Sequence, residues 1–104
     1  MTQRDELASL TEQIVKLARP VRIILFGSRV RGLQSRASDY DLLVVVKDGS
    51  RRREIAQNLY RNIRNIRTPF DLVVATESDL EEHGDNPYFI YKNAVDEGTK
   101  LYEA

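Results

Sequence analysis

Three short runs of β-branched and aromatic residues, set between stretches of helical periodicity, constrain the fold of this chain most. The runs are Val21–Phe26, Leu42–Val46 and Phe70–Ala75. Gly27 ends the first run, Asp48-Gly49 ends the second and Pro69 opens the third, as expected for strands that are bounded by turns. The order of helix, strand, strand, helix, strand and helix predicts an α/β (α+β) fold, a small mixed β-sheet packed with helices. Lys100–Tyr102 is a candidate edge strand.

Four helices are expected around these strands, besides a short helix between Ser28 and Ser38. The first ends before Pro20, Ser50 caps the second, Thr76 with Asp79 begins a short acidic third helix, and Pro87 opens the fourth. The first two carry apolar residues at helical spacing, which are Leu7, Leu10, Ile14 and Leu17 in the first and Ile55, Leu59, Ile63 and Ile66 in the second. Each of these two helices therefore has one face that can pack on the sheet.

Composition excludes several kinds of chemistry. The 104 residues carry 16 basic and 16 acidic side chains, so no field of the whole chain favours nucleic acid or a membrane surface. Cysteine is absent and His83 is the single histidine, which removes thiol catalysis and zinc sites built from these residues. No run approaches the roughly 18 apolar residues of a membrane span. We expect a single cytoplasmic domain over residues 1–104 and no membrane partner.

Three aspartates lie where strands usually hold apolar side chains. Asp39 and Asp41 are two residues apart at the start of the second run, so they project from one face, and Asp71 lies within the third run. A cluster of buried carboxylates is costly unless a cation binds to it, and oxygen ligands favour Mg²⁺ or Mn²⁺. The alternative is that Asp39 caps a turn, Asp41 is solvated and Asp71 pairs with one of the twelve arginines.

The turn Gly27-Ser28 is a candidate phosphate cradle. Glycine allows the backbone to approach a ligand closely, and the amides at a helix start, together with the Ser28 hydroxyl, can bind phosphate oxygens. Arg29, the next residue, could balance phosphate charge. Gly-Ser is also a common structural turn, and taken alone it does not decide between the two interpretations. A phosphate cradle that is followed by a carboxylate cluster is typical of a site that binds a nucleotide and a metal ion.

These residues also resemble a known family. Gly27-Ser28, ten intervening residues and Asp39-Tyr40-Asp41 match the GSx10DxD motif of the nucleotidyltransferase superfamily that includes DNA polymerase β. Residues 24–32 and 38–45 resemble in particular the minimal nucleotidyltransferases (MNT), the antitoxins of HEPN/MNT toxin-antitoxin pairs. Asp71 falls where that family places its third carboxylate. The resemblance extends from the first strand run to residues 97–102.

The resemblance implies a mechanism and a partner. Asp39 and Asp41 would ligate two Mg²⁺ ions, Asp71 would complete one of them and favour deprotonation of the attacking hydroxyl, and Gly27 with Ser28 would hold the phosphates of ATP. AMP would pass to a partner macromolecule, with a tyrosine of a HEPN-domain ribonuclease toxin as the leading acceptor. Two alternatives stay open. One is a non-catalytic antitoxin that neutralises its partner by occlusion, and the other is an enzyme that modifies a small molecule or an RNA end.

Two further features have plainer interpretations. Arginines crowd the segment 51–67, which could contact RNA or an acidic partner, although such a run is more often a solvated helix face. Direct binding of nucleic acid is left open. Tyr40, between two aspartates, points to the opposite face of its strand and is expected in the core.

Overall fold

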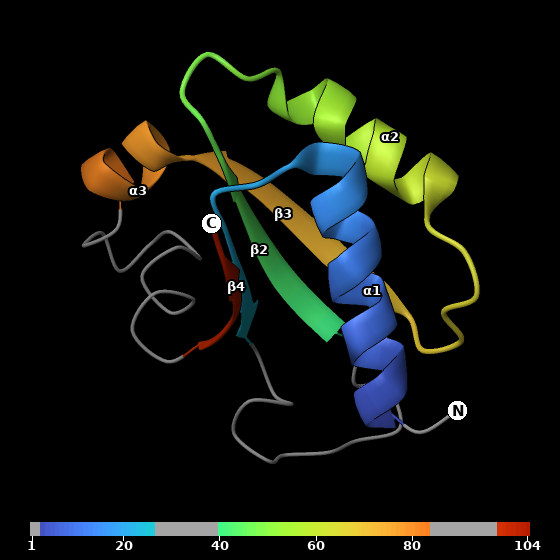
Figure 1. Ribbon diagram of the computed structural model, residues 1–104. Helices are drawn as coiled ribbons and strands as arrows, with labels where there is room; N and C mark the ends of the chain where they lie inside the picture. The colour runs from blue at the N-terminus through green and yellow to red at the C-terminus, as the bar shows by residue number, and fades with distance from the viewer. Residues whose placement is uncertain (1–2, 27–39, 84–97) are drawn as a thin grey trace.

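The computed structural model describes residues 3–26, 40–83 and 98–104, which form three helices and four strands (Figure 1). In chain order the elements are α1 Gln3–Ala18, β1 Arg22–Phe26, β2 Tyr40–Val46, α2 Arg52–Asn62, β3 Phe70–Thr76, α3 Glu77–His83 and β4 Thr99–Glu103. The three strand runs and the candidate edge strand are thus confirmed. In the described part of the chain, no helix has the length and apolar character needed to cross a membrane.

The strands form one mixed sheet in the order β3-β2-β1-β4. β1 is antiparallel to both of its neighbours, whereas β2 and β3 are parallel. A parallel pair needs a crossover connection, which α2 supplies here. The end of β1 and the starts of β2 and β3 consequently meet at one edge of the sheet. The predicted α+β class is confirmed.

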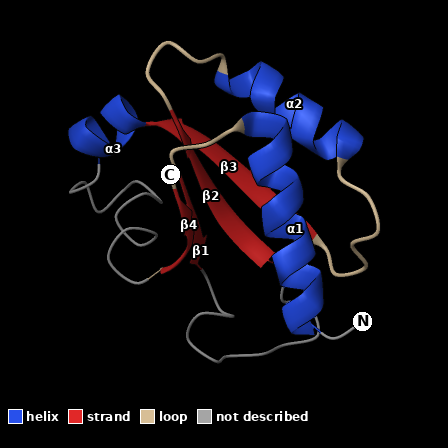
Figure 2. Cartoon of the chain, viewed as in Figure 1, coloured by secondary structure: helices blue, strands red, loops and turns tan. Residues whose placement is uncertain are grey.

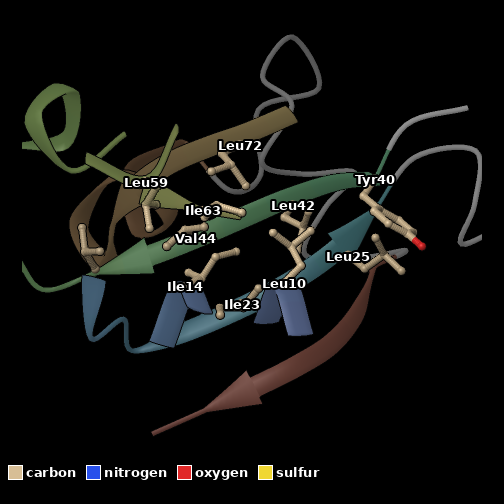
Figure 3. Close-up of a cluster of buried hydrophobic side chains, with 11 residues drawn as sticks. Leu10, Ile14, Ile23, Leu25, Tyr40, Leu42, Val44, Leu59, Ile63 and Leu72 are labelled. Atoms are coloured by element: carbon tan, nitrogen blue, oxygen red, sulfur yellow. The ribbon is translucent and has the colours of Figure 1, made fainter. Parts of the chain in front are cut away.

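Helices α1 and α2 lie side by side over one face of the sheet (Figure 2). Side chains that alternate along β1 and β2 meet the apolar faces of both helices there and form the main core. Its buried members are Leu10, Ile14, Ile23, Leu25, Tyr40, Leu42, Val44, Val46, Leu59, Ile63 and Leu72. Figure 3 shows Tyr40 at one end of this cluster, so its predicted place in the core is confirmed.

A smaller apolar cluster covers the opposite face of the sheet. It contains Ile24, Phe26, Leu43, Val45 and Ala75, with Leu80 of α3 packed against it. These strand residues alternate with those of the main core, so β1 and β2 are apolar on both faces. This explains why their sequences read as continuous apolar runs.

Two expectations about α2 are wrong. Ser50 does not cap the helix, because α2 begins one residue later than predicted; the Ser50 N–H bonds to the Lys47 carbonyl oxygen at 3.2 Å in the preceding turn. Arg51 is the N-cap instead, without a side-chain capping bond. The helical stripe does not reach Ile66, since α2 ends at Asn62 and Ile63 is already extended at ψ 133°. Ile66 still packs against the core from the following loop.

The ends of the other helices agree better with the sequence. Arg19 takes a left-handed conformation at φ 46° after α1, and Pro20 follows it, as predicted. Thr76 and Asp79 form the expected reciprocal cap of α3, with N–H to side-chain oxygen distances of 2.9 and 3.2 Å. This helix runs one residue further than expected, to His83. The predicted fourth helix and the short helix expected between Ser28 and Ser38 lie outside the described residues.

Tyr60 protects the outer edge of β3. Its ring stacks on Phe70 with 5.8 Å between the ring centroids, and its hydroxyl accepts the Leu72 N–H at 2.7 Å. The Leu72 N–H points away from β2. Backbone polar groups alternate sides along a strand, and the Pro69 carbonyl oxygen, three residues earlier, points toward β2 and accepts the Tyr40 N–H. An exposed tyrosine on α2 thereby satisfies a backbone donor that an edge strand would leave open.

Tyr60→Phe is expected to lower the free energy of unfolding by about 1 kcal/mol, the usual net contribution of one hydrogen bond. The stacked ring stays, so the change isolates the hydroxyl. Chemical denaturation measures the loss, and hydrogen exchange should show faster exchange at the Leu72 amide. Unchanged exchange at that amide would contradict the role of Tyr60.

Acid is expected to destabilise the chain through Asp79. The Thr76 N–H, the Thr76 hydroxyl and the Arg52 guanidinium at 2.7 Å hold the pKa of Asp79 below its ordinary value of 3.8, against the opposing effect of burial. A depressed pKa stabilises the fold above the unfolded pKa, and the contribution is lost as pH falls below about 4. Asp79→Asn should be less stable at pH 7 and should lose less on acidification, as denaturation at a series of pH values measures. An equal acid loss in both proteins would exclude Asp79 as a source.

Candidate functional site

The start of β2 and the start of β3 bring two of the three predicted carboxylates together. In the parallel register, Asp41 of β2 is the direct partner of Asp71 of β3. On its other side Asp41 is the partner of Phe26, the last residue of β1. Neighbouring strands lie about 4.8 Å apart, and direct partners share a face of the sheet. Asp41 and Asp71 therefore form an adjacent pair, which we call the carboxylate pair.

The carboxylate pair lies on the face opposite α1 and α2. Tyr40 and Leu42 point into the main core, so Asp41 between them projects to the other face, where Phe26 and Leu43 form the smaller cluster. Asp41 is half-buried and Asp71 is exposed. Neither carboxylate is fully buried, because both lie in the first two residues of their strands, at the open end of the sheet. Solvent and a ligand can reach Asp71 there.

The other predicted site residues lie outside the described part of the chain. These are Gly27, Ser28, Arg29 and Asp39. Gly27 directly follows Phe26, and Asp39 directly precedes Tyr40, so the chain enters and leaves that segment at the same sheet edge as the carboxylate pair. The roles of these four residues stay predictions.

Two adjacent carboxylates suit a hard divalent cation. Carboxylate oxygens are the ligands that Mg²⁺ and Mn²⁺ prefer, and like charges on neighbouring strands repel each other without a cation. Asp41 and Asp71 thus fit such an ion by donor type and by register. No group of three or more metal-ligating side chains is found within residues 3–26, 40–83 and 98–104. The predicted third carboxylate, Asp39, lies outside these residues.

A buried carboxylate supports this edge from the helical side of the sheet. Glu6 of α1 is only 7% exposed. It accepts the Arg67 N–H at 2.9 Å and the Thr68 N–H at 3.4 Å. The Thr68 hydroxyl most strongly, followed by the Arg67 N–H, holds the pKa of Glu6 below its ordinary 4.5, and the Tyr40 hydroxyl contributes in the same direction, while burial opposes them.

Sequence reasoning did not single out Glu6. The available signal was its position, because Glu6 precedes Leu10 and Ile14 at four-residue intervals on the buried face of α1. A buried carboxylate is costly unless hydrogen-bond donors surround it, and here the residues before β3 provide these donors.

The arginines of the segment 51–67 are solvent-exposed. Arg51 pairs with Glu54 at 3.2 Å and Arg52 pairs with Asp79 at 2.7 Å. Arg53, Arg61 and Arg67 are exposed as well. These observations agree with the plainer interpretation, a solvated helix face.

The sequence matches the family described as "Nucleotidyltransferase domain" over residues 5–101. A search of curated protein sequences finds no match. The matched residues include the Gly27-Ser28 turn and all three predicted carboxylates.

Solved structures share the fold. A protein from Sulfolobus solfataricus assigned as a nucleotidyltransferase superposes with a TM-score of 0.64 at 20% identity, covering 95% of this chain and 78% of that one. A toxin-antitoxin structure with AMP-PNP gives 0.60 at 24% identity, covering 99% and 75%. The toxin-antitoxin MntA-HpeT, in a form with two aspartates replaced by glutamate, gives 0.56 at 25% identity, covering 100% and 75%.

Proposed function

The chain belongs to the nucleotidyltransferase domain family, and we propose that it transfers AMP from ATP to a partner macromolecule in a reaction that depends on Mg²⁺. The register of Asp41 with Asp71 is the observation that carries this proposal. Asp41, from the GSx10DxD motif, and Asp71, the predicted third carboxylate, lie side by side at one end of the sheet. We further propose that residues 1–104 act as one domain and do so in the cytoplasm, where ATP and Mg²⁺ are abundant.

The bonds that change follow from the chemistry of nucleotidyl transfer. An acceptor hydroxyl oxygen bonds to the α-phosphorus of ATP, the bond from this phosphorus to the oxygen that bridges to the β-phosphate breaks, and pyrophosphate leaves. Gly27 and Ser28 hold the departing phosphates through backbone N–H groups and the hydroxyl, and Arg29 balances their charge. Asp71, exposed at the sheet edge, accepts the proton of the incoming hydroxyl.

Bound Mg²⁺ supplies charge stabilisation to the reacting phosphate. Asp39, Asp41 and Asp71 would hold it, with two ions shared among the three carboxylates. Asp41 is the strand partner of Asp71 on one side and of Phe26, the residue before Gly27, on the other. We therefore propose that Asp41 lies between the phosphate-binding residues and the other carboxylates.

We propose a HEPN-type ribonuclease toxin as the partner and one of its tyrosine hydroxyls as the acceptor. Two of the similar solved structures are toxin-antitoxin structures, and one of them carries AMP-PNP. The second, at 25% identity over the whole of this chain, supports the same role for this chain. An antitoxin that modifies its toxin needs a site open to a bulky acceptor, and the exposed Asp71 meets that requirement.

The test is mass spectrometry of a HEPN-domain toxin, such as one encoded by a neighbouring gene, after incubation with the chain, Mg²⁺ and ATP. We expect one or more adenylyl groups on a tyrosine of the toxin. AMP-PNP, in which the α–β bridge is an ordinary oxygen, should still donate AMP, whereas α,β-methylene ATP should not. Transfer of the γ-phosphate would show the reverse pattern and would contradict nucleotidyl transfer.

A second candidate is neutralisation by occlusion, which the toxin-antitoxin structures also favour because the two proteins are found together. In that case Asp41→Asn should still neutralise the toxin in cells, while a catalytic antitoxin should lose neutralisation with this change. Native mass spectrometry should confirm that the variant still binds the toxin. Transfer to RNA or to a small molecule in the absence of any protein acceptor would identify the other alternative.

A further inference from the structure

We propose that Glu6 is a positioning residue for the carboxylate pair, and that it sets the affinity of this edge for a divalent cation without touching the ion. The inference rests on the proposed function, because it assigns to Glu6 a role in holding the carboxylate pair of that proposed site. Glu6 lies on the opposite face of the sheet from Asp41 and Asp71, so it cannot be a third ligand of the pair.

The contacts of Glu6 converge on the residues that precede each carboxylate. Its two oxygens accept the Arg67 and Thr68 N–H groups at 2.9 and 3.4 Å, which fixes the loop directly before β3. The Tyr40 hydroxyl bonds to the same carboxylate. Thus one buried side chain of α1 binds both the first residue of β2 and the segment that leads into β3.

A further hydrogen bond closes this network between the strands. The Tyr40 N–H donates to the Pro69 carbonyl oxygen at 3.0 Å, at the first rung of the parallel pair. The next rungs are Tyr40 with Phe70 and Asp41 with Asp71. This hydrogen bond fixes the spacing of β2 and β3 at Tyr40, one residue before Asp41. Tyr40 is also the residue through which Glu6 connects β2 to α1.

The donors around Glu6 require a carboxylate. Two of them are backbone N–H groups, which cannot accept a hydrogen bond, so the amide NH₂ of a glutamine would leave one of them without an acceptor. Glu6→Gln keeps the size and shape of the side chain and removes this match. We expect the starts of β2 and β3 to separate slightly and the carboxylate pair to lose its spacing.

The experiment measures Mn²⁺ binding by electron paramagnetic resonance in the wild-type chain and in Glu6→Gln. Loss of a residue that orients metal ligands typically weakens metal binding about 10-fold or more, and we expect that effect here. The matched control is Ile14→Val or Ile14→Ala, whichever equals Glu6→Gln in its loss of stability. Ile14 is fully buried on the same face of α1 and lies two turns from Glu6, so this control should bind Mn²⁺ within about twofold of wild type.

Hydrogen exchange provides a second readout that needs no metal. Glu6→Gln should accelerate exchange of the Tyr40 amide, which bonds to Pro69, more than the stability-matched Ile14 variant does. If Glu6→Gln does not fold, Tyr40→Phe removes one of the hydroxyls from Glu6 and should still weaken Mn²⁺ binding.

The outcomes separate the inference from the function beneath it. Wild-type binding of Mn²⁺ that Asp41→Asn abolishes, but that Glu6→Gln weakens no more than the Ile14 control, would overturn the inference alone. Absence of Mn²⁺ binding in the wild-type chain would overturn the proposed function and the inference with it. Weak binding in Glu6→Gln with normal binding in the Ile14 control supports the positioning role.

Discussion

Replacing Asp71 with asparagine is expected to slow AMP transfer by about 1,000-fold, equivalent to about 4 kcal/mol of transition-state stabilisation. Asparagine keeps the shape of the side chain but removes the charge that pairs with Asp41 around a cation and the oxygen that accepts the acceptor's proton. Because Asp71 is exposed, its loss should leave the fold intact. Single-turnover transfer to the toxin measures the rate, and circular dichroism with denaturation checks the fold.

Glu81→Gln is the matched control for this experiment. Glu81 is an exposed carboxylate on α3, outside the carboxylate pair, and the change also removes one negative charge with an isosteric amide. We expect it to retain the wild-type rate. A comparable loss in both variants would point to net charge rather than to the pair, and full activity of Asp71→Asn would exclude a role for the Asp41–Asp71 register in catalysis.

The sequence was sufficient for the strands and for singling out Asp41 and Asp71, because each acid lies in or beside an apolar strand run. Asp71 interrupts an otherwise apolar strand, and a polar residue in such a run marks either a sheet edge or a site. The parallel register that makes Asp71 the partner of Asp41 could not be predicted from spacing, since α2 and the loop after it set how far β3 slides along β2.

The errors have two physical sources, which are the exact start of a helix and long-range contact. Ser50 is a good capping residue by type, but α2 begins one residue later, with Arg51 as its N-cap. Glu6 is typical of the acidic residues at helix starts, and its hydrogen bonds to Arg67 and Thr68, more than 60 positions later, form only in the folded chain. From the sequence, Tyr60 is an exposed aromatic residue without an assigned role; the fold brings the Leu72 N–H of β3 to its hydroxyl. Local propensity cannot anticipate partners that the tertiary fold supplies.

Leu42→Ala is expected to cost about 2–5 kcal/mol of unfolding free energy, the usual range for a large buried side chain that leaves a cavity. Leu42 is fully buried on the central strand β2, and its direct strand partners are Leu25 and Leu72. All three belong to the core beneath α1 and α2, as Figure 3 shows, so neighbours on both sides limit how far the cavity can collapse. The total stability of a domain is about 5–15 kcal/mol, so this loss could exceed half of it.

Leu101→Ala provides the comparison that isolates burial. Leu101 lies on the edge strand β4 and is only half-buried against the same core, so the substitution carries a similar strand-propensity cost with much less cavity. We expect it to lose less than half as much stability as Leu42→Ala in denaturant titrations. Equal losses would mean that the core does not close around Leu42 as described. Because Leu42 directly follows Asp41, a residual fold of Leu42→Ala should also bind Mn²⁺ more weakly than Leu101→Ala, which links the packing of the core to the spacing of the carboxylate pair.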